Sequence, residues 1–255
     1  VNVERERDLL SFVLSLIDKN LSRTTIAGKL AGISFYGKLC WGYDPVVGLL
    51  VRKVLKGWGR KKGVSGKLRD PVSKDLLLQL LGILPICCYN MFEAQSFRLL
   101  MIWMFFGAFR VSELLGSRSK AGLGYNEVFL EMGRLRIWLR TSKTDQIGRG
   151  HWIWLQGSGL ESLCPVKEWQ SFLATERSGG GEIFQHQNGS RITASNLLAV
   201  LRLCLGKLGL DARLYGTHSF RIGAATEAAR LGFSWGAVRN IGRWKSKCCE
   251  KYIRK

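Results

Sequence analysis

The chain has 255 residues, of which 39 are Lys or Arg and 19 are Asp or Glu, so its formal net charge is +20 at pH 7. With 46% apolar residues and only 4 prolines, the composition excludes general disorder and suits one large domain or two modest ones. A charge excess of this size favours a polyanionic partner, because each neutralised phosphate releases condensed counterions.

The first part of the chain predicts a small helical domain at residues 1–56. Apolar residues recur at helical spacing over residues 8–20 and again over 22–40, with Ser22 as the N-cap of the second helix. Asp44 and Pro45 are typical of a helix start and predict a third helix.

A glycine-rich, basic stretch follows and predicts a flexible cationic linker at residues 57–72. Within it, Arg60, Lys61 and Lys62 are candidates for contact with a DNA backbone, the alternative being a solvated surface loop. Charge is not confined to this stretch. Residues 1–70 carry 14 basic and 6 acidic side chains, net +8, which leaves +12 for the rest and suggests that both parts touch the polyanion.

Residues 73–255 predict a mostly helical domain with a small sheet. Helical spacing covers residues 73–84 and 93–109. Between Val128 and Leu155 the period changes: "RLRIWLR" and "HWIWL" predict strands on either side of the turn-rich "TSKTDQIGRG". Helical patterns then resume from residue 166. We therefore expect a mainly α fold with a small antiparallel β-sheet, that is, an α+β class.

Cysteine usage and hydropathy exclude other architectures. The seven cysteines are odd in number and form no Cys-x-x-Cys pair or Cys/His cluster, so we expect neither a disulfide framework nor a metal site. The longest strongly apolar run, residues 99–109, is too short to span a bilayer and predicts a buried helix. No secretory signal is visible, and because the chain starts at Val1 we expect it to be part of a longer or processed protein.

Two segments bring together residues that suit phosphate chemistry. In "FFGAFRVSELLG", Arg110 follows a helix-ending Gly107, and Glu113 comes one turn later. In "THSFRIGAA", helical spacing puts His218 and Arg221 on one face near a helix start. A helix N-terminus that carries an imidazole and a guanidinium suits a phosphate site.

A third segment, "GRWKSKCCEKYIRK", carries Trp244 and, eight residues later, Tyr252. Together these segments resemble the tyrosine recombinases, or phage-type integrases. "GAFRVSELL" is similar to the family's first arginine box, "THSFRIGAA" to its His-x-x-Arg box, "GRWKS…KYIRK" to its His/Trp-and-Tyr box, and "TSKTD" to its β-turn lysine segment. The resemblance covers nearly the whole chain: the first domain resembles the helical core-binding domain, and residues 73–255 the catalytic domain. The last two boxes most resemble recombinases of eukaryotic mobile elements of the DIRS and Crypton kind.

The resemblance implies a role for each of these residues. The catalytic set would be Arg110, Lys143, His218, Arg221, Trp244 and Tyr252, with Glu113 in support. The two arginines would clamp the phosphate oxygens that gain charge during transesterification. The imidazole would donate to the phosphate or accept the nucleophile's proton, and the indole N–H would donate to a phosphate oxygen. The phenol would be the nucleophile, and the lysine would protonate the departing 5′ oxygen. Each residue taken alone also has a structural alternative, such as core packing for the tryptophan.

The function implied by the resemblance is a site-specific DNA recombinase that cleaves and rejoins DNA through a covalent 3′-phosphotyrosine. No ATP, metal or other cofactor would be needed, because the ester bond energy is kept and electrostatic stabilisation replaces a metal ion. Its partners would be double-stranded DNA and further copies in a homo-tetramer, with no membrane and no small-molecule substrate. It would act in the nucleus of a eukaryote, or otherwise in the cytoplasm at the nucleoid. Two alternatives stay open: a catalytically silent, domesticated DNA-binding protein, and a nicking-closing enzyme of the type IB topoisomerase kind.

Overall fold

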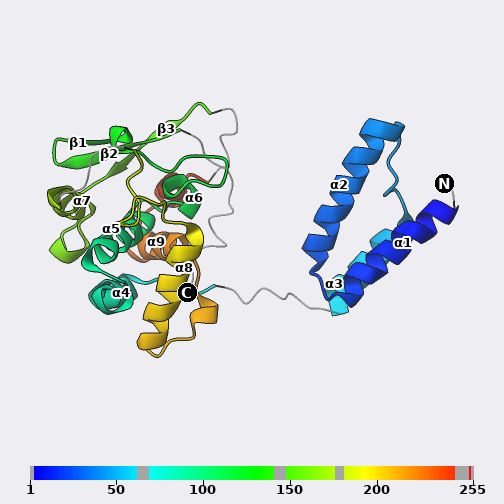
Figure 1. Cartoon of the computed structure of the whole chain (residues 1–255), viewed down its shortest axis with the longest axis horizontal. Coiled ribbons are helices and arrows are strands. Elements are labelled where there is room, and N and C mark those ends of the chain that lie inside the picture. Colours follow the sequence, from blue (N-terminus) through cyan, green and yellow to red (C-terminus); the bar gives the residue numbers. More distant parts are fainter. Residues whose placement is uncertain (1–2, 62–68, 141–147, 176–180, 245–252, 254–255) are drawn as a thin grey trace. The chain divides into compact units, whose positions relative to one another are not determined.

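The chain folds into two compact units, residues 1–67 and 68–255, each with its own hydrophobic core (Figure 1). The computed structural model describes residues 3–61, 69–140, 148–175, 181–244 and 253. Lys62, Lys143 and Tyr252, to which the sequence assigns roles, lie outside these ranges. Within them, no helix combines the length and the apolar character that crossing a membrane requires.

The N-terminal unit consists of three helices, α1 (Val3–Asp18), α2 (Arg23–Trp41) and α3 (Leu49–Lys61). Ser22 caps α2 as predicted, because its side-chain oxygen accepts the backbone N–H of Thr25 at 3.1 Å. The apolar faces of the helices meet in a small core formed by Val13, Leu16, Ile26, Leu30 and Val51.

Helix α3 differs from the prediction at both ends. It begins at Leu49 and not at Asp44, because the Asp44 carboxylate holds a turn: it accepts the Val46 N–H at 2.9 Å and pairs with Lys38 at 2.9 Å. At the other end the helix continues to Lys61, past the predicted boundary at residue 56. Trp58 explains this extension, since it packs against the core and its indole N–H donates to the Leu21 carbonyl at 2.9 Å.

The C-terminal unit is mainly helical and carries one small sheet. Its helices are α4 (Lys74–Cys87), α5 (Met91–Phe106), α6 (Val111–Leu114), α7 (Pro165–Ala174), α8 (Ala194–Lys207), α9 (Ser219–Arg230) and α10 (Trp235–Gly242). Single 3-10 turns lie at η1 (Tyr125–Glu127), η2 (Glu161–Leu163) and η3 (Ala212–Leu214). The strands are β1 (Val128–Glu131), β2 (Arg134–Leu139) and β3 (His151–Leu155).

The sheet confirms the predicted hairpin and adds a strand to it. Its order is β1-β2-β3 and both pairings are antiparallel, with Ile137 opposite Val128 on one side and Ile153 on the other. The hairpin tip, residues 141–147, lies outside the described residues. The fold is therefore mainly α with a small antiparallel sheet, which is the predicted class.

Helix α5 forms the centre of the C-terminal unit and packs against α4, α7 and α9. Every residue from Leu99 to Phe105 is at most 4% exposed, which confirms that the apolar run is a buried helix. Helix α9 approaches the end of α5 closely at Gly223, where a Cβ would overlap the Val72 carbonyl and lie 3.2 Å from the Phe105 ring. This close packing brings the first turn of α9 to the corner where α5 ends and α6 begins.

Candidate active site

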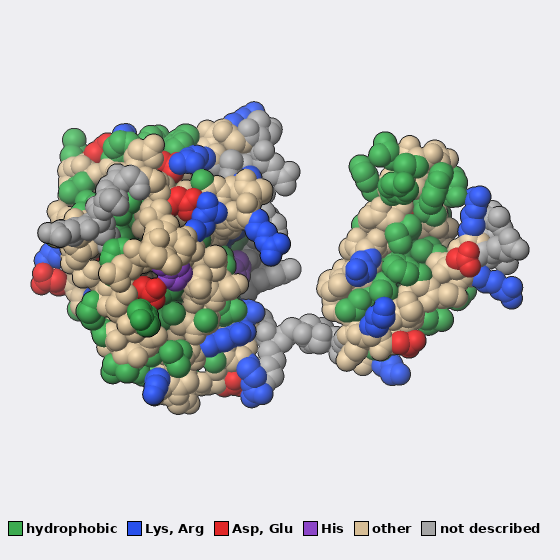
Figure 2. Space-filling model, viewed as in Figure 1, with side chains coloured by type: hydrophobic (Ala, Val, Ile, Leu, Met, Phe, Trp, Pro, Cys, Tyr) green, Lys and Arg blue, Asp and Glu red, His purple; other side chains and the backbone are tan. Residues whose placement is uncertain are grey.

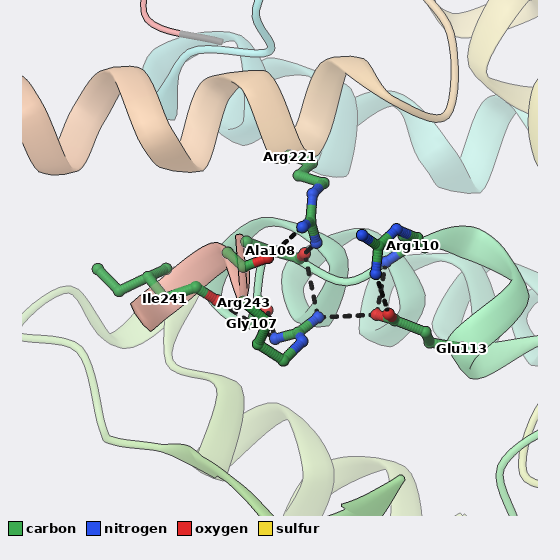
Figure 3. A network of polar contacts seen from close by, with 8 residues as sticks. Gly107, Ala108, Arg110, Glu113, Arg221, Ile241 and Arg243 are labelled. Carbon is green, nitrogen blue, oxygen red and sulfur yellow. Dashed lines mark hydrogen bonds and ion pairs between the residues drawn. The ribbon is translucent and has the colours of Figure 1, made fainter. Parts of the chain in front are cut away.

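Arg110 stands at the corner between α5 and α6 and is held there by Glu113. Its backbone N–H donates to Glu113 Oε2 at 2.9 Å and its Nη1 donates to Glu113 Oε1 at 2.7 Å (Figure 3). The glutamate side chain is 2% exposed, whereas the arginine side chain is 18% exposed. The carboxylate thus fixes the arginine from within, while part of the arginine side chain still reaches the surface.

Arg221 projects from the first turn of α9 toward the same corner and is completely buried. Its Nη1 donates to the carbonyl of Ala108 and its Nη2 to the carbonyl of Gly242, the last residue of α10. The guanidinium carbon lies 4.5 Å from the centre of the Trp244 ring, within cation–π distance. Arg221 therefore joins α9 to the end of α5 and to the end of α10.

A third arginine, Arg243, enters this network without having been predicted. Its Nη2 lies 2.7 Å from Glu113 Oε2, and its Nη1 donates to the Gly107 carbonyl at 2.8 Å (Figure 3). Its backbone is left-handed, with φ of 55°, at the end of α10. That conformation turns the side chain inward, and nothing in the spacing of "IGRWK" signals it.

Electrostatics keep the Glu113 carboxylate ionised in spite of its burial. Burial alone would raise its pKa, but the Arg243 charge and the hydrogen bonds and charge of Arg110 outweigh this effect and hold the pKa below its ordinary value. With one carboxylate among three guanidiniums, the corner stays cationic. A cationic, partly exposed corner of this kind suits a phosphate.

His218 and Trp244 occupy different environments beside these arginines. His218 is the half-buried N-cap of α9, and its carbonyl accepts the Ile222 N–H at 3.0 Å. Trp244 is 7% exposed and belongs to an apolar cluster with Ala225, Ala228 and Val238. The tryptophan thus packs in a core as well as against Arg221, and its role toward a phosphate stays a prediction.

Lys143 and Tyr252 lie outside the described residues, but residues next to them are fixed. Arg140, at the end of β2, is held at two points by the buried Glu127, with distances of 2.5 and 2.7 Å. Ile253 packs against the cluster that contains Trp244. Arg140 and Ile253, which flank these undescribed stretches, thus each have a defined contact in the C-terminal unit.

Two further predicted residues belong to the N-terminal unit. Arg60 and Lys61 are exposed on the last turn of α3, in the N-terminal unit. In the described ranges, no group of three or more His, Cys, Asp or Glu side chains is placed to hold a metal ion.

Comparison with known proteins gives one curated relative in sequence. It is described as "Integrase/recombinase xerD homolog" from Selenomonas ruminantium and is 25% identical over 223 residues, which cover 83% of this chain. The aligned part spans 61% of that relative's length. No protein-family model matches the chain.

Solved structures share the fold at lower identity. A Tn1549 transposon integrase in complex with a circular intermediate DNA has a TM-score of 0.66 at 15% identity, covering 98% of this chain and 81% of its own. The XerH site-specific recombinase bound to difH has a TM-score of 0.57 at 20% identity, covering 93% and 68%. A lambda integrase dimer bound to a COC′ core site has a TM-score of 0.56 at 15% identity, covering 100% and 72%. At these identities the likeness shows a common fold.

Proposed function

We propose that this chain, which is related to the tyrosine recombinases and integrases in sequence and fold, is a site-specific DNA recombinase. One observation carries the proposal. Arg110 and Arg221 come from segments more than a hundred residues apart and meet at one corner, where the buried Glu113 carboxylate binds Arg110. A partly exposed arginine whose guanidinium is oriented by a buried carboxylate is suited to bind a backbone phosphate in two-point fashion.

In the proposed reaction the Tyr252 phenol attacks a DNA phosphorus. The phenol gives its proton to His218, the phosphorus–tyrosine oxygen bond forms while the bond to the 5′ oxygen breaks, and Lys143 gives that oxygen its proton. The product is a 3′-phosphotyrosine, and the reverse attack by a 5′ hydroxyl rejoins the strand. Arg110 stabilises the charge that the non-bridging oxygens gain in the transition state, and electrostatic stabilisation of this kind is usually the largest contribution to catalysis. Because the ester bond is exchanged and not hydrolysed, the reaction needs no cofactor.

Arg221 is completely buried and would have to move to contact the phosphate. Its two terminal nitrogens donate to the Ala108 and Gly242 carbonyls. These bonds are charge-assisted on the donor side alone, whereas a phosphate adds a second charge and can accept two parallel N–H bonds. We therefore expect DNA to draw Arg221 away from one carbonyl, with His218, the N-cap of the same helix, moving beside it.

The partners we propose are double-stranded DNA and further copies of the chain in a homo-tetramer. Basic side chains lie on the visible face of both units, which supports DNA contact by each (Figure 2). Arg60 and Lys61, exposed at the end of α3, would contact the DNA backbone. The motif wording supports a mobile-element recombinase of the DIRS or Crypton kind, which would act in a nucleus.

The test is covalent capture on DNA. The protein is incubated with a pool of randomised duplexes, each with one nick. After cleavage the nick lets the short fragment that bears the new 5′ hydroxyl leave, and this loss traps the adduct. We expect a denaturant-resistant adduct on the 3′ side of the break, lost in Tyr252→Phe while salt-sensitive DNA binding remains. Binding without any adduct would leave the silent DNA-binding protein, and plasmid relaxation by a monomer would favour the topoisomerase alternative.

A further inference from the structure

We propose that Arg243 is a positioning residue for this site: it holds the carboxylate of Glu113 that orients Arg110. The inference rests on the proposed function and adds to it a residue that the resemblance leaves without a role. Four features support it: the donors of Arg243, its contact with Glu113, the Ala108 carbonyl that it shares with Arg221, and its backbone conformation.

All four terminal N–H groups of Arg243 have acceptors within the protein. Nη1 donates to the Gly107 carbonyl at 2.8 Å and to the Ile241 carbonyl at 3.2 Å. Nη2 donates to Glu113 Oε2 at 2.7 Å and to the Ala108 carbonyl at 3.3 Å. The side chain is 13% exposed. With its terminal donors engaged, this arginine is arranged to support neighbouring groups and not to bind a phosphate itself.

Glu113 depends on Arg243 for half of its ion pairing. Oε1 accepts Arg110 Nη1, and Oε2 accepts both the Arg110 backbone N–H and Arg243 Nη2. A carboxylate that is 2% exposed loses its hydration and needs such partners to stay ionised. Without Arg243 the buried carboxylate would keep one cation, and its grip on Arg110 would weaken.

The Ala108 carbonyl connects Arg243 to the second arginine of the site. It accepts a hydrogen bond from Arg221 Nη1 and another from Arg243 Nη2. Arg243 therefore borders both groups that we propose for the phosphate clamp, one through Glu113 and one through this carbonyl.

The backbone is in an unfavourable conformation at both residues of the contact between Arg243 Nη2 and the Ala108 carbonyl. Arg243 has φ of 55° and Ala108 has φ of 42°, in the left-handed region that favours glycine. Such conformations persist where surrounding contacts hold them, and they gather at functional sites. Here the Arg243 side chain contributes to both, because its guanidinium bonds the Ala108 carbonyl and the Glu113 carboxylate, beside the Arg221 bond to Ala108 and the backbone N–H bonds of Arg243 at the end of α10.

The experiment compares two DNA substrates under single-turnover conditions at saturating protein. One carries a normal phosphate at the cleaved position. The other carries a methylphosphonate, in which a methyl group replaces a charged oxygen and leaves the guanidinium clamp little to stabilise. Arg243→Gln should slow cleavage of the phosphate substrate by about 100-fold, the loss seen when one transition-state donor is removed. It should slow the methylphosphonate substrate far less, with DNA affinity nearly unchanged, and Arg110→Ala should show the same selectivity.

Three further variants separate positioning from folding. Arg243→Lys keeps the charge but not the planar fork, so we expect an intermediate loss with the same selectivity. The matched control is Arg239→Gln, which removes an exposed positive charge from the same helix, α10, and should leave cleavage unchanged. In an Arg110→Ala background, Arg243→Gln should add little, since both changes remove one function. Equal slowing of both substrates, or no slowing, would overturn the proposal.

A measurement that needs no catalytic activity tests the positioning role separately from the proposed recombinase function. If the wild-type protein forms no adduct at all, the recombinase proposal fails. The positioning role is then judged by nuclear magnetic resonance of the Arg110 side-chain Nε–H group. Arg243→Lys or Arg243→Gln should increase the motion of that group, and an unchanged signal would exclude the positioning role.

Discussion

Replacing Glu113 with Gln should destabilise the C-terminal unit strongly, although the two side chains have nearly the same shape. The glutamate is 2% exposed and lies 2.7 Å from both Arg110 Nη1 and Arg243 Nη2. A glutamine offers one oxygen, so its NH2 group must face an N–H donor at one of the two positions. Breaking a buried ion pair on one side costs about 3–5 kcal/mol, and we expect about 3 kcal/mol because the shape is kept.

Chemical and thermal unfolding followed by circular dichroism will measure this loss. For a unit of this size, about 3 kcal/mol corresponds to a fall in Tm of about 6–12 °C. The control is Glu161→Gln, which removes an exposed ion pair with Lys167 and should leave the Tm nearly unchanged. A loss below about 1 kcal/mol for Glu113→Gln, a typical value for an exposed pair, would refute the buried arrangement of the two arginines around the carboxylate.

Three more predictions follow from the same structure. Because the pKa of Glu113 is lowered in the fold, its ionised carboxylate stabilises the fold above the ordinary carboxyl pKa of about 4.3, and this stabilisation is lost as the pH falls through the folded pKa. The difference in free energy of unfolding between wild type and Glu113→Gln should therefore be constant near neutral pH and shrink below pH ~4, as measured by unfolding at a series of acid pH values. Gly242→Ala should lower the free energy of unfolding by about 1–3 kcal/mol, because its Cβ would overlap the Trp244 ring. Gly206→Ala inside α8 has open space at its Cβ and should raise the free energy of unfolding by about 0.5–1 kcal/mol, and denaturant unfolding measures both variants. Arg60→Ala should weaken DNA binding about equally for all sequences and reduce the slope of log affinity against log salt by about 1, measured by fluorescence anisotropy, and an unchanged slope would contradict the proposed backbone contact.

The sequence predicts the features that local patterns determine. The apolar run of α5 predicts a buried helix, and the position of Gly107 predicts the corner at which Arg110 stands. The alternation in "RLRIWLR" and "HWIWL" predicts β2 and β3, and the spacing of His218 and Arg221 predicts a helix start. In each case the chain carries its own signal within a few residues.

Features that depend on distant partners were missed. The start of α3 is shifted because Asp44 binds a residue of α2, and α3 is longer because Trp58 reaches the carbonyl of Leu21. In the sequence, Arg243 cannot be distinguished from a surface cation. Its role depends on its left-handed backbone and on its contact with Glu113, 130 residues earlier in the chain. The complete burial of Arg221 depends in the same way on carbonyls from α10 and the end of α5.

The hydrogen bond from Arg221 to Gly242 ties two parts of the site to a single atom. The carbonyl that receives the guanidinium is also the end of α10, from which the chain continues through Trp244 toward Tyr252. A substitution that displaces the end of α10 would therefore also displace an acceptor of the Arg221 guanidinium. The placement of this helix end and the placement of that buried side chain are set together, so neither changes alone.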